Sequence, residues 1–132
     1  MNLTVGALRE RLARGEPTFL PDVRASKEFA TFKIEGPHPI DTLNVPYTRI
    51  LAEADEDAIP AAAATYLGKH YADKIPHHRL VVTVYAKGGT SAYVAEGLRT
   101  LGYEAVNLEG GMAAWRRGET ITKRSRSSKS PD

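Results

Sequence analysis

The stretch LVVTVYAKGGTSAYVAEGLRTLGYEAVNL, residues 80–108, decides the fold. It opens with Leu80–Tyr85, a continuous β-branched run that is typical of a strand covered on both faces. A glycine-containing loop follows, and Ser91–Leu101 then carries apolar residues at helical spacing until Gly102 ends the pattern. Ala105–Leu108 resumes as a strand. Strand, loop, helix and strand within about 30 residues form a βαβ unit, whose two strands lie parallel in one sheet.

The residues before this unit predict further elements of the same sheet. Thr4 is a candidate N-cap of a helix, and Thr18–Val23 is a short apolar run of the kind found in buried strands. Ser26 is a candidate cap of a brief helical turn, and a short extended segment is expected near Leu43–Val45.

Helices are expected on either side of the βαβ unit. Residues 48–71 predict two helices, with Pro60 at the first position of the second. A last short helix carries Met112 and Trp115. We therefore predict an α/β fold, with one central, mostly parallel sheet of about five strands flanked by helices on both faces.

Composition is that of an ordinary soluble protein. The 132 residues fit one domain, and 42% apolar with 26% charged residues leaves no apolar run near the roughly 18–20 residues that span a bilayer. The amphipathic, charged N-terminus differs from a secretion signal, so we expect a cytoplasmic protein that does not bind membranes. The chain has no cysteine, which excludes disulfides, thiolate metal sites and cysteine nucleophiles.

Positive charge is concentrated at the C-terminus. Residues 1–115 carry 12 Lys and Arg against 14 Asp and Glu, whereas residues 116–132 carry 6 against 2. The chain is therefore divided into a domain over residues 1–117 and a basic tail over residues 118–132, whose Ser-, Lys- and Arg-rich composition predicts disorder. Nucleic acid could bind only through this tail, by counterion release. No aromatic residues are interleaved with the basic ones to support a binding motif, so nucleic acid is not the expected partner.

The segment YAKGGTS, which we call the glycine loop, joins the predicted strand to the predicted helix. Unpaired amides and the positive end of the helix dipole make such a junction suitable for an anion, while Thr90 or Ser91 is expected to cap the helix. A tight connection with no ligand fits the local pattern equally well. The loop has neither the spacing of a nucleotide P-loop nor a GxGxxG pattern, so we expect no cofactor.

Several segments, taken in order, resemble the rhodanese family, whose members carry sulfur on a cysteine at this loop. The matching segments are Asp22–Phe29, Asn44–Pro46 and Val81–Trp115, with LEGGMAAW at residues 108–115 the most specific piece. The sequence is most similar to the subgroup with a C-A-K-G-G-S/T-S loop.

The resemblance aligns the family's catalytic cysteine with Tyr85. The rest of its anion-binding loop falls on Ala86, Lys87, Gly88, Gly89, Thr90 and Ser91. A gapped alignment instead places Ala86 at the nucleophile, and neither register supplies a thiol. A phenol with an ordinary pKa near 10 has no sulfur to form a persulfide, so Tyr85 is expected to be inactive in that chemistry. Its ring is bulky enough to fill the pocket of the persulfide.

Charged and histidine side chains give weaker signals. Asp22 and Arg24 match the family's DVR segment, which implies a structural ion pair near the site. Lys87 is either an anion-attracting charge or an ordinary surface lysine. The four histidines lack HExxH or a spaced acidic partner, so no metal site is predicted.

Three hypotheses for function follow. The first is a rhodanese-like domain, related to thiosulfate sulfurtransferase but inactive in persulfide chemistry, that binds a small anion such as thiosulfate, sulfate or phosphate, or a protein partner. The second is an enzyme that acts on phosphate or sulfur oxyanions through the amide cradle of the loop. The third is a sulfurtransferase whose cysteine at position 85 was replaced by tyrosine, a change that alone would silence it.

Overall fold

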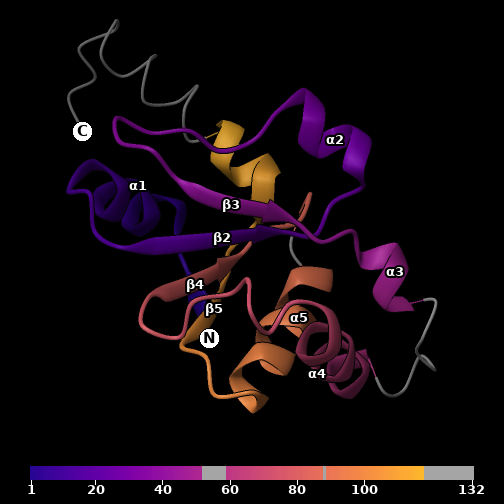
Figure 1. Cartoon of the computed structure of the whole chain (residues 1–132). Helices are drawn as coiled ribbons and strands as arrows, with labels where there is room; N and C mark the ends of the chain where they lie inside the picture. The colour runs from indigo at the N-terminus through magenta and orange to yellow at the C-terminus, as the bar shows by residue number, and fades with distance from the viewer. Residues whose placement is uncertain (52–58, 88, 118–132) are drawn as a thin grey trace, which may run out of the picture.

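The structure is a computed structural model that describes residues 1–51, 59–87 and 89–117. Five strands pair in parallel to form one sheet, in the order β1-β5-β4-β2-β3 (Figure 1). This confirms the predicted α/β fold with a parallel sheet. The strands are β1 (Asn2–Leu3), β2 (Thr18–Asp22), β3 (Asp41–Asn44), β4 (Leu80–Thr83) and β5 (Ala105–Leu108).

Helices cover both faces of the sheet. Helix α1 and a last helix of residues 111–117, which we call the C-terminal helix, lie on one face, and α4 and α5 lie on the other (Figure 1). Helices α2 and α3 follow the ends of β2 and β3. The labelled helices are α1 (Val5–Ala13), α2 (Ser26–Thr31), α3 (Tyr47–Leu51), α4 (Ile59–His70) and α5 (Thr90–Thr100).

The sheet separates two apolar cores, because successive residues of a strand point to opposite faces. Val81 of β4 packs in the core with α4 and α5, whereas Val82 and Val84 pack in the core with α1 and the C-terminal helix. Side chains from the same stretch of chain therefore pack in both cores. This explains why the β-branched run at residues 80–85 has no polar alternation.

Helices α4 and α5 approach each other closely at Gly97. A Cβ atom at that position would lie 2.8 Å from the carbonyl oxygen of Pro60 and 3.1 Å from the Cβ of Ala63. The contact therefore depends on small residues on both helices. It fixes the position of α5 against α4.

Several local expectations were wrong or shifted. Ala25, not Ser26, is the N-cap of α2, and it makes no side-chain cap bond. The third strand begins at Asp41 instead of near Leu43. Strand β1 was not predicted at all.

Other expectations hold within the described residues. Thr4 caps α1, since its Oγ1 accepts a hydrogen bond of 3.1 Å from the amide of Ala7. Two helices do occupy the predicted stretch from residue 48 to 71, although residues 52–58 lie outside the described part. The basic tail, residues 118–132, lies outside it as well. In the described ranges, no helix is long and apolar enough to cross a bilayer.

Candidate functional site

The glycine loop lies at the carboxyl edge of the sheet, where the parallel strands end. It connects β4 to α5, and it follows the isolated bridge between Asp22 and Val84. The amide of Val23 donates to the carbonyl of Val84 at 2.8 Å, and the amide of Val84 donates to the carbonyl of Pro21 at 3.0 Å. The segments that follow β2 and β4 therefore leave the sheet side by side. Clefts at this edge are the usual ligand sites of open parallel sheets.

Backbone contacts to the C-terminal helix hold the first half of the glycine loop. The carbonyl of Tyr85 accepts a hydrogen bond of 2.7 Å from the amide of Met112, and the carbonyl of Ala86 accepts one of 2.8 Å from Ala113. These bonds turn two loop carbonyls toward that helix. Carbonyl oxygens repel anions. An anion on the side of the loop that faces away from this helix would therefore not meet these two oxygens.

The second half of the loop starts α5 without a side-chain cap. Gly89 is the N-cap, with φ at 76°, a conformation that glycine adopts readily. The expectation that Thr90 or Ser91 would cap the helix was wrong. Thr90 is the first helical residue, and the hydroxyl of the fully buried Ser91 donates to Oδ1 of Asn107. The amide of Ala92 donates to the carbonyl of Gly89 at 2.9 Å. The amides before it lack an i−4 acceptor, as at the start of every α-helix.

Tyr85 lies beside a second tyrosine that the sequence did not single out. The rings of Tyr85 and Tyr47 meet edge to face, with centroids 5.2 Å apart and an interplanar angle of 83°. Tyr85 is half-buried and packs against the core that contains α4 and α5. Tyr47 directly follows the matched segment at Asn44–Pro46, which is the one sequence signal that could have identified it.

The environment of Tyr85 keeps its phenol protonated. A hydrogen-bonding interaction with Tyr47 raises the pKa of Tyr85 above its usual value near 10, and burial raises it further. A side-chain interaction with Thr90 lowers the pKa by less. At neutral pH the group is therefore a neutral hydrogen-bonding partner. It is not a phenolate nucleophile.

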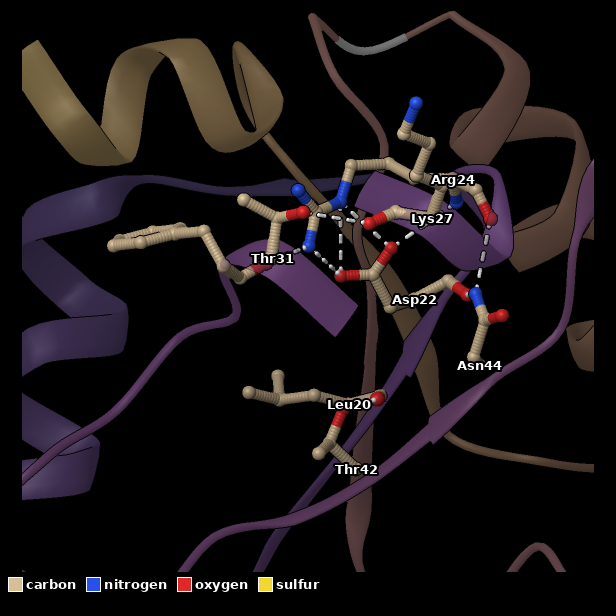
Figure 2. Close-up of polar contacts among 8 residues, drawn as sticks. Leu20, Asp22, Arg24, Lys27, Thr31, Thr42 and Asn44 are labelled. Carbon is tan, nitrogen blue, oxygen red and sulfur yellow. Dashed lines mark hydrogen bonds and ion pairs between the residues drawn. The ribbon is translucent and has the colours of Figure 1, made fainter. Parts of the chain in front are cut away.

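Asp22 and Arg24 form a buried ion pair next to the loop, with side chains 4% and 5% exposed (Figure 2). Oδ1 of Asp22 accepts from the backbone amide of Arg24 at 3.0 Å and from its Nε at 2.9 Å. Oδ2 accepts from the terminal guanidinium nitrogen of Arg24 at 2.7 Å. That nitrogen also donates to the carbonyl of Phe32. The pair ties the end of β2 to the segment after α2.

Asn44 extends this network to β3. Its Nδ2 donates to the carbonyl of Asp22 at 3.0 Å and to the carbonyl of Arg24 at 2.9 Å (Figure 2). The residues that match the family's segments at Asp22–Phe29 and Asn44–Pro46 are therefore bonded to each other. Asn44 is a structural partner whose role the sequence did not predict.

The remaining predicted residues are placed as follows. Ala86 is partly buried, and Lys87 is exposed on the loop. Gly88 lies outside the described residues. Across the described ranges, no group of three or more His, Asp or Glu side chains is arranged to hold a metal ion.

Solved structures with the same fold are similar to this chain over most of its length. A rhodanese-like domain protein from Staphylococcus aureus is 30% identical with a TM-score of 0.59, and the match covers 86% of this chain and 89% of that one. A human single-domain sulfurtransferase is 26% identical with a TM-score of 0.58, and the match covers 88% and 95% of the two chains. No curated protein matches the sequence significantly.

The amino-acid sequence also matches a family model. The model for the rhodanese-like domain matches residues 4–117, which include both strand-end loops and the C-terminal helix. The chain thus belongs to the rhodanese-like domain family.

Proposed function

We propose that this chain is a rhodanese-like binding module without persulfide chemistry, formed by residues 1–117, which takes a small anion or a protein partner at the glycine loop. One observation carries the proposal. The chain has no cysteine. The resemblance aligns the family's catalytic cysteine with Tyr85 or, in the gapped register, with Ala86, and neither is a thiol. Sulfur transfer through a persulfide requires a thiolate, which no residue of the chain supplies.

The geometry of the loop supports a binding role. Two of its carbonyls are turned toward the C-terminal helix, and Gly89, the N-cap of α5, makes no side-chain cap bond. The amides of the first helical turn and the exposed Lys87 then favour a negatively charged ligand. Thiosulfate, sulfate and phosphate have the size and charge for such a loop. The ring of Tyr85, which belongs to the loop and meets Tyr47 edge to face, would border the ligand and limit its size.

An activity assay with a restored cysteine tests the loss of sulfur transfer. We expect the purified chain to show no thiosulfate:cyanide sulfurtransferase activity. We expect Tyr85→Cys to acquire one sulfur atom from thiosulfate, detected as a mass gain that cyanide removes. Ala86→Cys is the matched control, because it places the same thiol at the nucleophile position of the gapped alignment.

The outcomes separate the hypotheses. Turnover by the unaltered chain that disappears in Tyr85→Phe would refute the proposed loss of activity. If neither cysteine variant reacts with thiosulfate, the loop has lost the geometry that stabilises a thiolate. A full gain of turnover by Tyr85→Cys would mean that one substitution separates this chain from an active sulfurtransferase.

An anion titration tests the binding role itself. Sulfate added to the ¹⁵N-labelled chain should shift the amide signals of Gly89, Thr90 and Ser91 and saturate, while the signals of α1 stay in place. Lys87→Ala should weaken the binding, since it removes the positive charge nearest the loop. Unchanged loop signals at saturating sulfate would exclude a sulfate-like ligand and leave the protein partner as the proposed role.

A further inference from the structure

Three buried polar side chains lie together beneath the first turn of α5. Thr83 and Ser91 are fully buried, and Asn107 is 5% exposed. They come from three different elements, since Thr83 ends β4, Ser91 is the second residue of α5, and Asn107 lies in β5. None of the three belongs to the ion pair of Asp22 and Arg24.

Hydrogen bonds join these three side chains into one network. The Thr83 hydroxyl donates to the backbone carbonyl of Ser91 at 2.8 Å. The Ser91 hydroxyl donates to Oδ1 of Asn107, whose Nδ2 donates to Oδ1 of Asn2 at 3.3 Å. The network therefore binds the first turn of α5 to β4 directly and to β1 through β5.

The pairing of the strands places this network in one row across the sheet. Asn107 pairs with Thr83 on one side and with Asn2 on the other. Side chains two residues apart on a strand share a face, so Thr83 lies on the face of Val81, and Asn107 on that of Ala105. Val81 and Ala105 pack in the core with α4 and α5. The row thus faces α5.

The surrounding core does not require polar groups here. Val81, Val94 and Leu98 fill the same face with apolar side chains, and buried polar atoms carry a desolvation cost unless they are bonded. Hydrogen bonds are directional, however, and a satisfied buried network restricts its elements to one arrangement. The polar row lies at the carboxyl edge, directly below the glycine loop, where the orientation of the helix start matters most.

We propose that Thr83, Ser91 and Asn107 are positioning residues, which hold the first turn of α5 in the orientation that ligand binding at the glycine loop needs. They act through the backbone amides in the first turn of α5 and contact no ligand themselves. The inference rests on the proposed binding role for its functional consequence. The effect of Asn107 and Thr83 on the conformation of the loop does not depend on that role, and it is measured by a separate readout.

The test uses the full chain with two matched pairs of variants. Thr83→Val keeps the shape and removes the hydroxyl, and Thr83→Ser keeps the hydroxyl. Asn107→Leu removes the acceptor of Ser91, and Gly97→Ala disturbs α5 at its contact with α4 without touching the network. Each variant is followed by ¹H–¹⁵N spectra, by its unfolding temperature, and by titration with inorganic sulfate.

We expect Thr83→Val and Asn107→Leu to move the amide signals of Gly89 and Thr90 and to weaken sulfate binding about fivefold, as the loss of one net hydrogen bond would. Thr83→Ser should restore both readouts. Gly97→Ala should lower the unfolding temperature yet keep the sulfate affinity. A merely structural network would instead lower the unfolding temperature and leave the sulfate affinity of the folded variants unchanged.

Two outcomes are distinguishable. Loop amide signals in Thr83→Val and Asn107→Leu that match those of Gly97→Ala overturn the positioning role, whatever the sulfate titration gives. If the unaltered chain itself binds no sulfate, the proposed anion site fails, while displaced loop signals in these two variants still support positioning by the network.

Discussion

Two loops at the same edge of the sheet are held in place by different kinds of contact. After β2, the carboxylate of Asp22 accepts from the backbone and the guanidinium of Arg24, so the charged groups of that loop are satisfied within it. After β4, the glycine loop is held by hydrogen bonds from the amides of Met112 and Ala113 to its carbonyls, and the N-cap of α5, Gly89, makes no side-chain cap bond. The first loop supplies a rigid frame. The second keeps backbone amides available beside that frame.

Breaking the frame should produce the largest effect. Arg24→Met keeps the aliphatic stem but leaves the carboxylate of Asp22 buried without its partner, and such changes cost about 3–5 kcal/mol. Urea unfolding should therefore show a much lower free energy of unfolding. The α2 segment should also lose order, because Arg24 bonds to the carbonyl of Phe32.

A surface ion pair provides the control for that prediction. Arg79 pairs with Asp41 at the opposite end of the sheet, with side chains 32% and 59% exposed. Arg79→Met should change the free energy of unfolding by less than about 1 kcal/mol. Similar losses for Arg24→Met and Arg79→Met would contradict the distinction between a buried frame and an ordinary surface contact.

The glycine loop should respond to a backbone change with a smaller loss. Gly89→Ala forces an alanine to adopt a φ of 76°, although a Cβ there would meet no atom within 4 Å. The expected cost is about 1–3 kcal/mol, from backbone strain alone. Gly6→Ala is the matched control, because Gly6 lies inside α1 with open space around it, and there alanine should stabilise by about 0.5–1 kcal/mol. Equal effects of the two substitutions would argue against strain at Gly89.

The smallest effect should be visible only at alkaline pH. Tyr47→Phe removes the main cause of the raised pKa of Tyr85, so that pKa should fall toward its usual value near 10. A raised pKa in the folded state favours the protonated phenol. Its stabilising contribution is therefore complete below about pH 10 and is lost as the pH rises through the folded pKa.

Absorbance titration of tyrosinate measures this shift, with Tyr85→Phe identifying the signal that belongs to Tyr85. Tyr93→Phe, an exposed position on α5, should leave that signal unchanged. A Tyr85 pKa that stays raised in Tyr47→Phe would mean that burial, and not the neighbouring hydroxyl, is the main cause. In that event the two rings would be packing partners only.

The central βαβ unit could be predicted because its signals are local. A β-branched run, a glycine turn and a helical stripe follow one another directly, and β4, α5 and β5 appeared where expected. Strand β1 has two residues, too few for any periodicity to appear in the sequence. The start of β3 was missed because its first residues, Asp41 and Thr42, have no apolar pattern. Their strand conformation comes from pairing with Phe19 and Leu20 of β2.

The sequence predicted the loop of the site but not the residues that contact the loop. Gly89 and the hydroxyl residues near it mark a helix start, yet the hydroxyl of Ser91 turned out to bond downward to Asn107 instead of capping α5. Tyr47 and Asn107 carry no motif of their own. Both act through contacts between elements distant in sequence, which only the assembled fold brings together.

The place of β5 in the sheet has a consequence for synthesis on the ribosome. Within the described ranges, β1 pairs only with β5, the last of these strands to be made. The carbonyls of the glycine loop accept hydrogen bonds from Met112 and Ala113, which come later still. Nascent chains that end before residue 105 therefore expose an unpaired β4 edge and an unsupported loop. Because such long-range pairing makes folding slow and leaves strand edges open to aggregation, this domain should depend on protection of its nascent chain until the C-terminal helix has emerged.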